Sequence, residues 1–150
     1  MLRRSVRSVE GLVRSGEFSC DNAGPMGSWW EMRITRQVVV FDAADLAAES
    51  AFWAGVLDGT VDAEDDWHRV MVDGESRVAV QLAPNHVSPD WPDGTPEQQI
   101  HLDLWVEDFA AAHDRVMSLG ARVLKPAAAD DNFQVYADPA GHPFCLCWVQ

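Results

Sequence analysis

Apolar and polar positions follow the same order twice along this chain. Residues 38–59 have a short apolar run, an acidic step at Asp45, an alanine-rich stretch and a closing glycine, and residues 101–120 repeat this order with Asp108. Further short apolar runs and a tight turn follow each of the two segments. A repeat of this kind fixes the architecture before any single residue does. The pattern predicts one domain made of two similar halves, with a cleft between them.

The same pattern predicts the individual elements. Alternating and β-branched runs indicate strands, and an acidic cap with a glycine stop indicates a helix. In the first half we expect strands at 34–41, 60–62, 67–72 and 77–82, and a helix at 46–57. In the second half we expect strands at 100–106, 122–124, 133–137 and 144–149, and a helix capped by Asp108 that runs to 119. Each half is βαβββ, so the predicted fold class is α+β, with two modules forming a curved, mostly antiparallel sheet around a concave cleft and helices outside.

Composition separates the two ends of the chain. Residues 1–31 are rich in Ser, Gly and Arg and lack periodicity, so we expect a disordered N-terminal extension there. The folded domain is expected at 32–150. It divides into module 1 at about 33–83, a proline-rich linker at about 84–98 and module 2 at about 99–150.

Charge and cysteine content limit the possible partners and compartment. The net charge is −13, and residues 1–31 carry as many Arg as acidic residues, so the excess lies in the folded part. This excess argues against nucleic acid and anionic membranes as partners, and no apolar run is long enough to span a membrane. Cys20, Cys145 and Cys147 are too few and too unevenly placed for a disulfide framework. We therefore expect a cytoplasmic protein.

Strand alternation selects the first candidate site residues. His101, Asp103 and Trp105 share one face of their strand, while the leucines between them share the other. The leucine face is expected to pack under the helix, which turns the other face toward the cleft. Asp103 then has the position of a general base beside His101. The alternative is that Asp103 bonds a neighbouring strand or orients His101.

The remaining candidates are expected to bind a ligand rather than react with it. Small-molecule pockets have aromatic walls and a few polar groups. The residues expected to form these walls, on strands that face the cleft, are Trp105, Trp67, Phe133 and Tyr136, together with Gln81. The alternative is that these aromatic side chains belong to the core.

The repeat and its motifs resemble a known superfamily. FDAADLAAESAFWAGVLDG opens the first half, HLDLWVED opens the second, and DPAGHPFCLC closes it. With these motifs, residues 34–149 resemble the vicinal oxygen chelate superfamily of glyoxalase I, bleomycin resistance proteins and extradiol dioxygenases. The chain is most similar to its small glyoxalase-like domain proteins. The resemblance implies a cleft-forming fold and a homodimer.

The resemblance also implies where a metal would bind. Metal-dependent members of the superfamily take ligands from the first and last strand of each half, and these positions carry no carboxylate here. A Mg²⁺ or Mn²⁺ site with hard oxygen ligands is therefore disfavoured, and we expect no cofactor. A softer site stays open, for a divalent metal such as Zn, Fe, Ni or Mn. Its ligands would be His101 and Cys145, with Gln37 or Gln81.

Two functions follow from these observations. The first is metal-independent binding of a small apolar, aromatic or cationic molecule in the cleft, as in glyoxalase and bleomycin-resistance-like proteins. The alternative is an enzyme of the same superfamily, a lyase, isomerase or dioxygenase. That enzyme would use His101 and Asp103, with a metal completed by Cys145.

Overall fold

A computed structural model describes residues 34–92 and 94–149. Residues Thr35–Gln150 form one compact unit that contains both modules. The predicted extension at 1–31 lies outside the described residues. The first half comprises β1 (Val39–Ala43), α1 (Leu46–Val56), β2 (Thr60–Ala63), β3 (Trp67–Val72) and β4 (Glu75–Leu82). The second half comprises β5 (Leu102–Trp105), α2 (Phe109–Ser118), β6 (Arg122–Lys125), β7 (Phe133–Ala137) and β8 (Pro143–Cys147).

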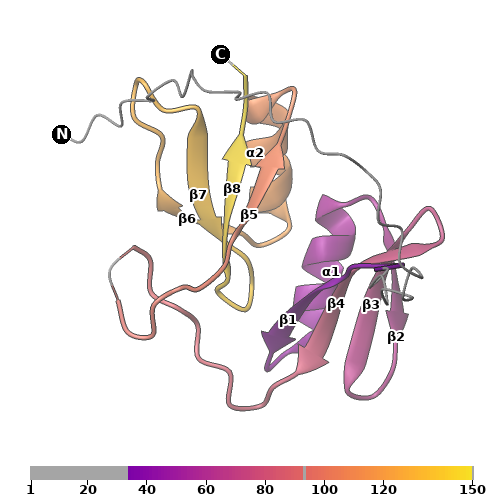
Figure 1. Cartoon of the computed structure of the whole chain (residues 1–150). Coiled ribbons are helices and arrows are strands. Elements are labelled where there is room, and N and C mark those ends of the chain that lie inside the picture. The colour runs from indigo at the N-terminus through magenta and orange to yellow at the C-terminus, as the bar shows by residue number, and fades with distance from the viewer. Residues whose placement is uncertain (1–33, 93, 150) are drawn as a thin grey trace, which may run out of the picture. The chain divides into compact units, whose positions relative to one another are not determined.

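The two halves have the same topology. Their strands form two four-stranded sheets, with the orders β1-β4-β3-β2 and β5-β8-β7-β6 (Figure 1). In each sheet the first and last strands of the module pair in parallel, and the other pairings are antiparallel. The predicted α+β class, with two tandem βαβββ modules, is confirmed.

The bounds of the first and last strands differ from the predicted ones because strand pairing sets them. The first strand was expected at 34–41, but β1 starts at Val39 and continues to Ala43, because its residues pair in register with Val78 to Leu82 of β4. The last strand was expected to reach 149 and stops at Cys147, which pairs with Phe133. In both cases the strand is bounded by its in-register pairing and not by the length of the apolar run.

Both helices begin at the predicted acidic caps. The Asp45 side chain accepts a hydrogen bond of 2.9 Å from the Ala48 N–H, and Asp108 accepts one of 3.0 Å from the Ala111 N–H. Each bond satisfies one of the free amides in a first helical turn. The same local device therefore starts the helix in each half.

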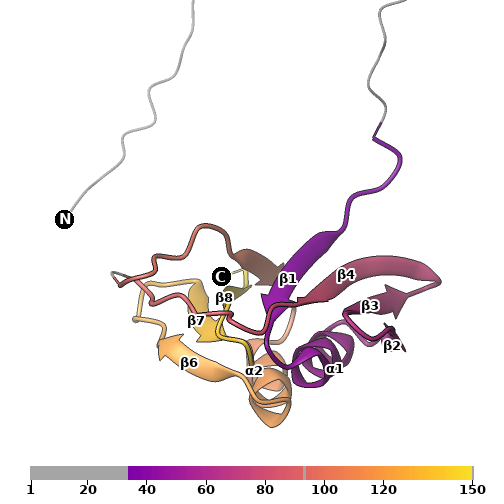
Figure 2. The same cartoon turned by 90° about the horizontal axis from the view of Figure 1, so that it is seen from below.

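One apolar cluster contains residues of both halves. Phe41, Phe52 and Trp53 of the first half pack in it with Tyr136 and Phe144 of the second. The helices lie side by side (Figures 1 and 2), and Arg115 of α2 donates hydrogen bonds to the carbonyl of Gly55 in α1. The modules are therefore joined through a common core on the sides of the sheets that carry the helices.

The alternation of β5 follows from this core. Leu102 and Leu104 pack against the shared cluster, which turns Asp103 and Trp105 to the opposite face of the sheet. That face carries a small cluster of its own, with Val135, Cys145 and Cys147. The predicted separation of a leucine face from a polar face is confirmed.

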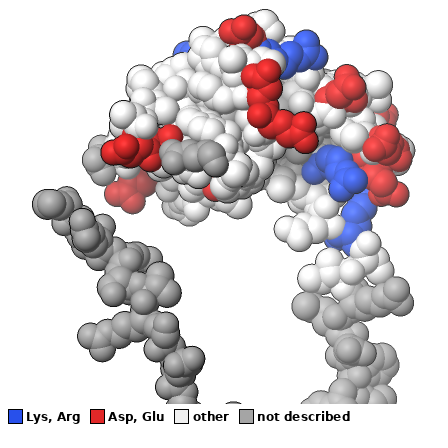
Figure 3. Space-filling view, turned by 90° about the horizontal axis from the view of Figure 1, so that it is seen from above, with Lys and Arg blue, Asp and Glu red and all other residues white. Residues whose placement is uncertain are grey.

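The surface carries charges of both signs, and the helices are short. Acidic side chains are interspersed with Lys and Arg on the face drawn in Figure 3. In the ranges 34–92 and 94–149, neither helix has the length and apolar character that crossing a membrane requires.

Candidate functional site

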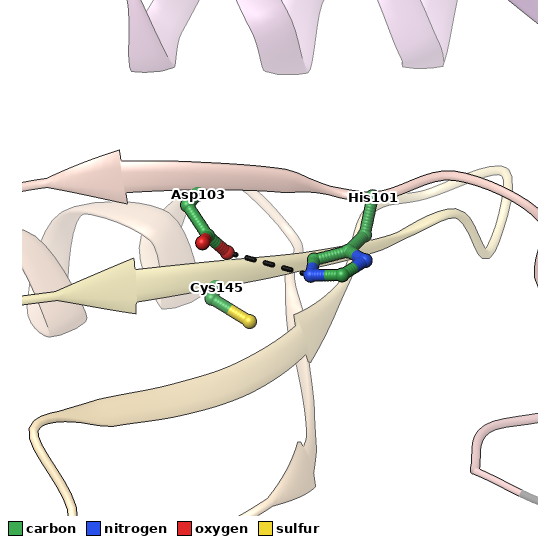
Figure 4. Close-up of side chains that lie close together, drawn as sticks. All are labelled: His101, Asp103 and Cys145. Atoms are coloured by element: carbon green, nitrogen blue, oxygen red, sulfur yellow. Dashed lines mark ion pairs between the residues drawn. The ribbon is translucent and has the colours of Figure 1, made fainter. Parts of the chain in front are cut away.

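His101, Asp103 and Cys145 meet on the face of the second sheet that lies opposite α2. Asp103 on β5 is paired in register with Cys145 on β8, and His101 lies just before β5. The three side chains point toward one another (Figure 4), and their ligand atoms lie within 4.8 Å of each other. His101 Nε2 is 3.5 Å from Asp103 Oδ1. The parallel pairing of β5 with β8 therefore brings together residues more than forty positions apart.

These three side chains line a cavity of about 360 Å³, which we call the aromatic cavity. Its walls include Trp91, Trp105 and Phe133, with Asn132 and Cys147 completing the lining. Trp105 is 63% exposed, whereas Trp91 packs on the cluster beneath. The cavity thus combines apolar walls with a few polar groups, as small-molecule sites do.

The environment of Cys145 holds a proton on its sulfur. Burial, together with the nearby Asp103 carboxylate, raises the pKa of the Cys145 thiol to about 12. Burial and Asp103 also raise the pKa of Cys147. A protonated thiol is a poor nucleophile. Without a bound cation, Cys145 therefore acts as a small apolar side chain.

A larger cavity of about 590 Å³ lies on the other side of His101. It is lined by Gln37 and Val38 before β1, Gln81 at the end of β4, and His101. These positions come from corresponding strands of the two halves, so this cavity is one part of the predicted cleft, while Asp103, Trp105 and Cys145 line the aromatic cavity. Gln81 and Cys145 line different cavities, and only His101 among these positions borders both.

Two expected wall residues lie elsewhere. Tyr136 is fully buried in the core, where its hydroxyl is 2.7 Å from His113 Nδ1 on α2. The alternation of β7 turns Tyr136 toward the helix and Phe133 toward the aromatic cavity. Trp67 is half-buried on β3 beside Gln81 and is not among the described residues that line either cavity.

Asp103 is more open to solvent than the general-base prediction assumed. Its side chain is 52% exposed and that of His101 is 39% exposed. A carboxylate in contact with water keeps most of its hydration. The site therefore offers Asp103 as a negative charge and hydrogen-bond acceptor beside an imidazole.

The linker between the modules places two of its side chains beside the site. Trp91 packs against the cluster of Val135, Cys145 and Cys147. Gln98 Nε2 lies 3.5 Å from His101 Nδ1. The Trp91 Nε1 and Gln98 Oε1 atoms are buried without a hydrogen-bond partner in the described residues. Proline-rich composition gave no sign that these two side chains flank the site.

A second polar cluster lies at the junction of the modules. Glu49 of α1 and Asp138 after β7 are both fully buried, and His142 is close to both carboxylates. Trp53 Nε1 donates to Glu49 Oε1 at 2.8 Å and to Asp138 Oδ2 at 3.2 Å. None of these four residues was among the candidate site residues predicted from the sequence. The sequence signal that could have indicated this cluster is Glu49, a charged residue one helical turn before Trp53 in a mostly apolar helix.

Comparison with known proteins gives one family and a set of similar folds. Residues 38–147 match a family model described as Glyoxalase-like domain. No curated protein matches the chain in sequence.

Solved structures with the same fold include a fosfomycin resistance protein and two enzymes. The fosfomycin resistance protein FosX from Mesorhizobium loti is 17% identical, with a TM-score of 0.59 over 79% of this chain and 95% of its own. A glyoxalase-related enzyme from Fulvimarina pelagi is 19% identical, with a TM-score of 0.57 over 77% of this chain and 89% of its own. A glyoxalase/bleomycin resistance protein/dioxygenase family enzyme from Burkholderia phytofirmans is 15% identical, with a TM-score of 0.57 over 75% and 97%. At these identities the likeness establishes the fold alone.

Proposed function

Because the chain belongs to the glyoxalase-like domain family, we propose that it binds a small aromatic molecule in the aromatic cavity without needing a metal. One observation carries this proposal: Trp91, Trp105 and Phe133 surround the polar pair of His101 and Asp103. Flat apolar rings stack on such walls. The half-exposed Asp103 carboxylate favours a cationic ring over an anionic one, and Trp105 adds a cation–π surface.

Tryptophan fluorescence tests the proposal directly, since two of the walls are indoles. The probes are small aromatic cations, their neutral isosteres and fosfomycin, which is included because FosX, a fosfomycin resistance protein, has the same fold. An aromatic cation should quench the fluorescence saturably. Asp103→Asn should weaken its binding about tenfold and bind the neutral isostere unchanged.

Matched variants separate the site from the rest of the protein. Asp114→Asn removes one negative charge from the exposed side of α2 and should leave binding unchanged. Trp105→Leu should weaken the cation and the neutral ring alike. Equal affinity in wild type and in the Asp103 and Trp105 variants would contradict the proposal.

A metal-dependent enzyme is the second candidate, and the convergence of His101, Asp103 and Cys145 favours it. An imidazole, a carboxylate and a thiolate are an acceptable zinc-type set with one position left open. A bound ion would act as a Lewis acid toward a substrate oxygen. All three side chains would hold the ion, and Cys145 would have to lose its proton on binding.

Elemental analysis of the purified protein decides between the candidates. Near-stoichiometric Zn, Fe, Ni or Mn that is lost in His101→Ala would establish the second candidate. Metal-free protein that still binds aromatic probes would establish the first. Turnover of a dicarbonyl–thiol adduct or a catechol by metal-loaded protein would add the reaction class.

We also expect a homodimer, formed through the free edges of the sheets. Among residues 34–92 and 94–149, β1 and β5 each pair with a strand on one side only, and Val40 and Trp105 on these strands are 44% and 63% exposed. Unpaired strand edges with apolar side chains favour association. Light scattering after size exclusion should give twice the chain mass. Val40→Glu should shift it toward one chain, and a mass of one chain for wild type would contradict the expectation.

A further inference from the structure

The larger cavity contains polar groups that the proposed function does not use. Its walls are mainly apolar and come from Val38 to Phe41 and from Ile100 and Leu102. His142, from the turn between β7 and β8, lines it together with His86 from the linker. This cavity shares only His101 with the aromatic cavity.

The His142 ring is fixed on three sides. Its Nδ1 is 3.2 Å from Asp138 Oδ2 and 3.6 Å from Glu49 Oε1. The ring packs against Phe41 and His86, with both centroid distances 4.9 Å. The side chain is 17% exposed. Within 34–92 and 94–149 no hydrogen bond to its Nε2 is found, and the residue lines the larger cavity.

The carboxylates around His142 already have donors. Glu49 Oε2 accepts from the Ala140 N–H at 3.0 Å. Asp138 Oδ1 accepts from the backbone N–H groups of Gly141 and His142 at 2.9 and 2.8 Å. These N–H donors fix both carboxylates beside the ring, so the cluster can hold a cationic imidazole.

The charge state of the cluster agrees with this arrangement. Burial alone would lower the pKa of His142, but hydrogen bonds to Asp138 and Glu49 outweigh it and raise the pKa to about 9. Burial raises the pKa of Glu49 to about 7. For Asp138, burial is outweighed by the hydrogen bonds with His142 and Glu49, and its pKa is lowered. Near neutral pH the cluster therefore contains an imidazolium, an ionised Asp138 and a titrating Glu49.

We infer that the larger cavity is a second ligand site, in which the Nε2–H of His142 binds the carboxylate of a small organic acid with an apolar body. The apolar stretch of β1 and the side chains of Ile100 and Leu102 would contact that body. Gln37 and Gln81 line the same cavity and carry amide donors for a second oxygen. The inference concerns a different cavity and the opposite ligand charge from the proposed function.

Carboxylates near the site should make the binding of an anionic ligand depend on pH. The titratable groups that face His142 are Glu49 of α1, Asp138 beside β7 and His86 of the linker, and Asp42 and His101 line the same cavity. A carboxylate that enters beside His142 favours the protonated forms of Glu49 and His142. Binding therefore takes up a proton, and affinity falls as pH rises.

Benzoate is a suitable probe, since it is ionised throughout the range of interest. Benzamide and benzylamine are the neutral and cationic controls. We expect benzoate to bind at least about tenfold more tightly near pH 6 than near pH 9. Calorimetry in buffers of different ionisation enthalpy should show proton uptake, and benzoate should shift the NMR signal of the His142 ring. Benzamide binding of equal strength, or pH-independent binding, would overturn the inference.

Variants separate this site from the aromatic cavity. His142→Gln should lose benzoate binding and keep the binding of the aromatic cation, whereas loss of both ligands would overturn the inference of a separate site. If His142→Gln does not fold, Glu49→Gln serves instead. It should retain benzoate binding and reduce its pH dependence between about pH 6 and 7.5, with Asp114→Asn as the charge-matched control. An unchanged pH dependence in Glu49→Gln would overturn the inference.

Discussion

Trp53 Nε1 donates a hydrogen bond of 3.2 Å to Oδ2 of Asp138, which lies 85 positions further along the chain. The same indole stacks on Phe41, with ring centroids 4.9 Å apart. One side chain of α1 thus belongs to the apolar core and also pairs with the buried carboxylate of the second module. The junction between the modules is a polar contact inside an apolar cluster.

Trp53→Phe should lower the free energy of unfolding by about 1–3 kcal/mol near pH 7. Phenylalanine keeps most of the stacking on Phe41 but removes the N–H that Glu49 and Asp138 accept. Urea unfolding measures the change. Trp148→Phe is the control, because Trp148 packs on Phe109 at the edge of the core, and it should cost less. Equal losses in both variants would contradict the role assigned to the Trp53 N–H.

Stability should fall as pH rises from about 4.5 to about 9. Glu49 has a pKa raised from 4.5 to about 7, so the folded protein binds more protons than the unfolded chain across that interval. His142, raised from 6.5 to about 9, extends the effect upward. Asp138 acts in the opposite direction at low pH, since its pKa is lowered and its contribution is lost on acidification. Urea unfolding at several pH values should show a decrease on the order of a few kcal/mol.

Glu49→Gln identifies the group responsible for the lower part of that dependence. Glutamine resembles the protonated carboxyl group and does not titrate. The variant should therefore have a flatter stability profile between about pH 4.5 and 7, while the decrease from His142 above that interval remains. A profile that parallels wild type throughout would show that Glu49 does not titrate in the folded protein as stated.

Gly55→Ala should destabilise the contact between the helices by about 1–3 kcal/mol. A Cβ atom at Gly55 would lie 2.5 Å from Leu119 Cδ2, so the Leu119 side chain would have to move. Thermal unfolding measures the loss. In Gly55→Ala/Leu119→Ala the added methyl group has room, and the double variant should lose less than the sum of the single variants. Strict additivity would contradict the contact.

Both buried thiols should resist thiol reagents in the folded protein. A Cys20→Ser background leaves Cys145 and Cys147, whose pKa values are raised by burial and by Asp103. At about pH 8 they should react with a disulfide reagent at least about tenfold more slowly than an exposed free thiol does. Asp103→Asn should speed the reaction by removing the neighbouring charge. Fast labelling of folded protein with native thermal stability would contradict the assigned environment.

The sequence predicted the local elements because their signals are local. Asp45 and Asp108 cap the helices as expected, and the alternation of His101, Asp103 and Trp105 gives the face that the structure shows. Strand ends were less predictable. The first strand moved to Val39–Ala43 because its bounds depend on a partner forty positions away.

The candidate site was predictable where one strand supplies it. His101 and Asp103 follow from a single alternating run, and Cys145 from the matching motif. Tyr136 was misplaced because alternation gives two faces without saying which one the helix covers, and one position decides between them. The contribution of Trp91 and Gln98 depends on how the linker folds back, which proline content does not indicate.

By itself the sequence determined the doubled βαβββ order, its caps and the grouping of side chains by strand face, since each depends on neighbours a few positions apart. Only the tertiary structure decided that Glu49 meets Asp138 and His142, and that His101 borders two cavities. Those meetings require the register of two sheets and the packing of α1 against a turn of the other module. Both are set by the shared apolar core, whose contacts join residues far apart in the chain.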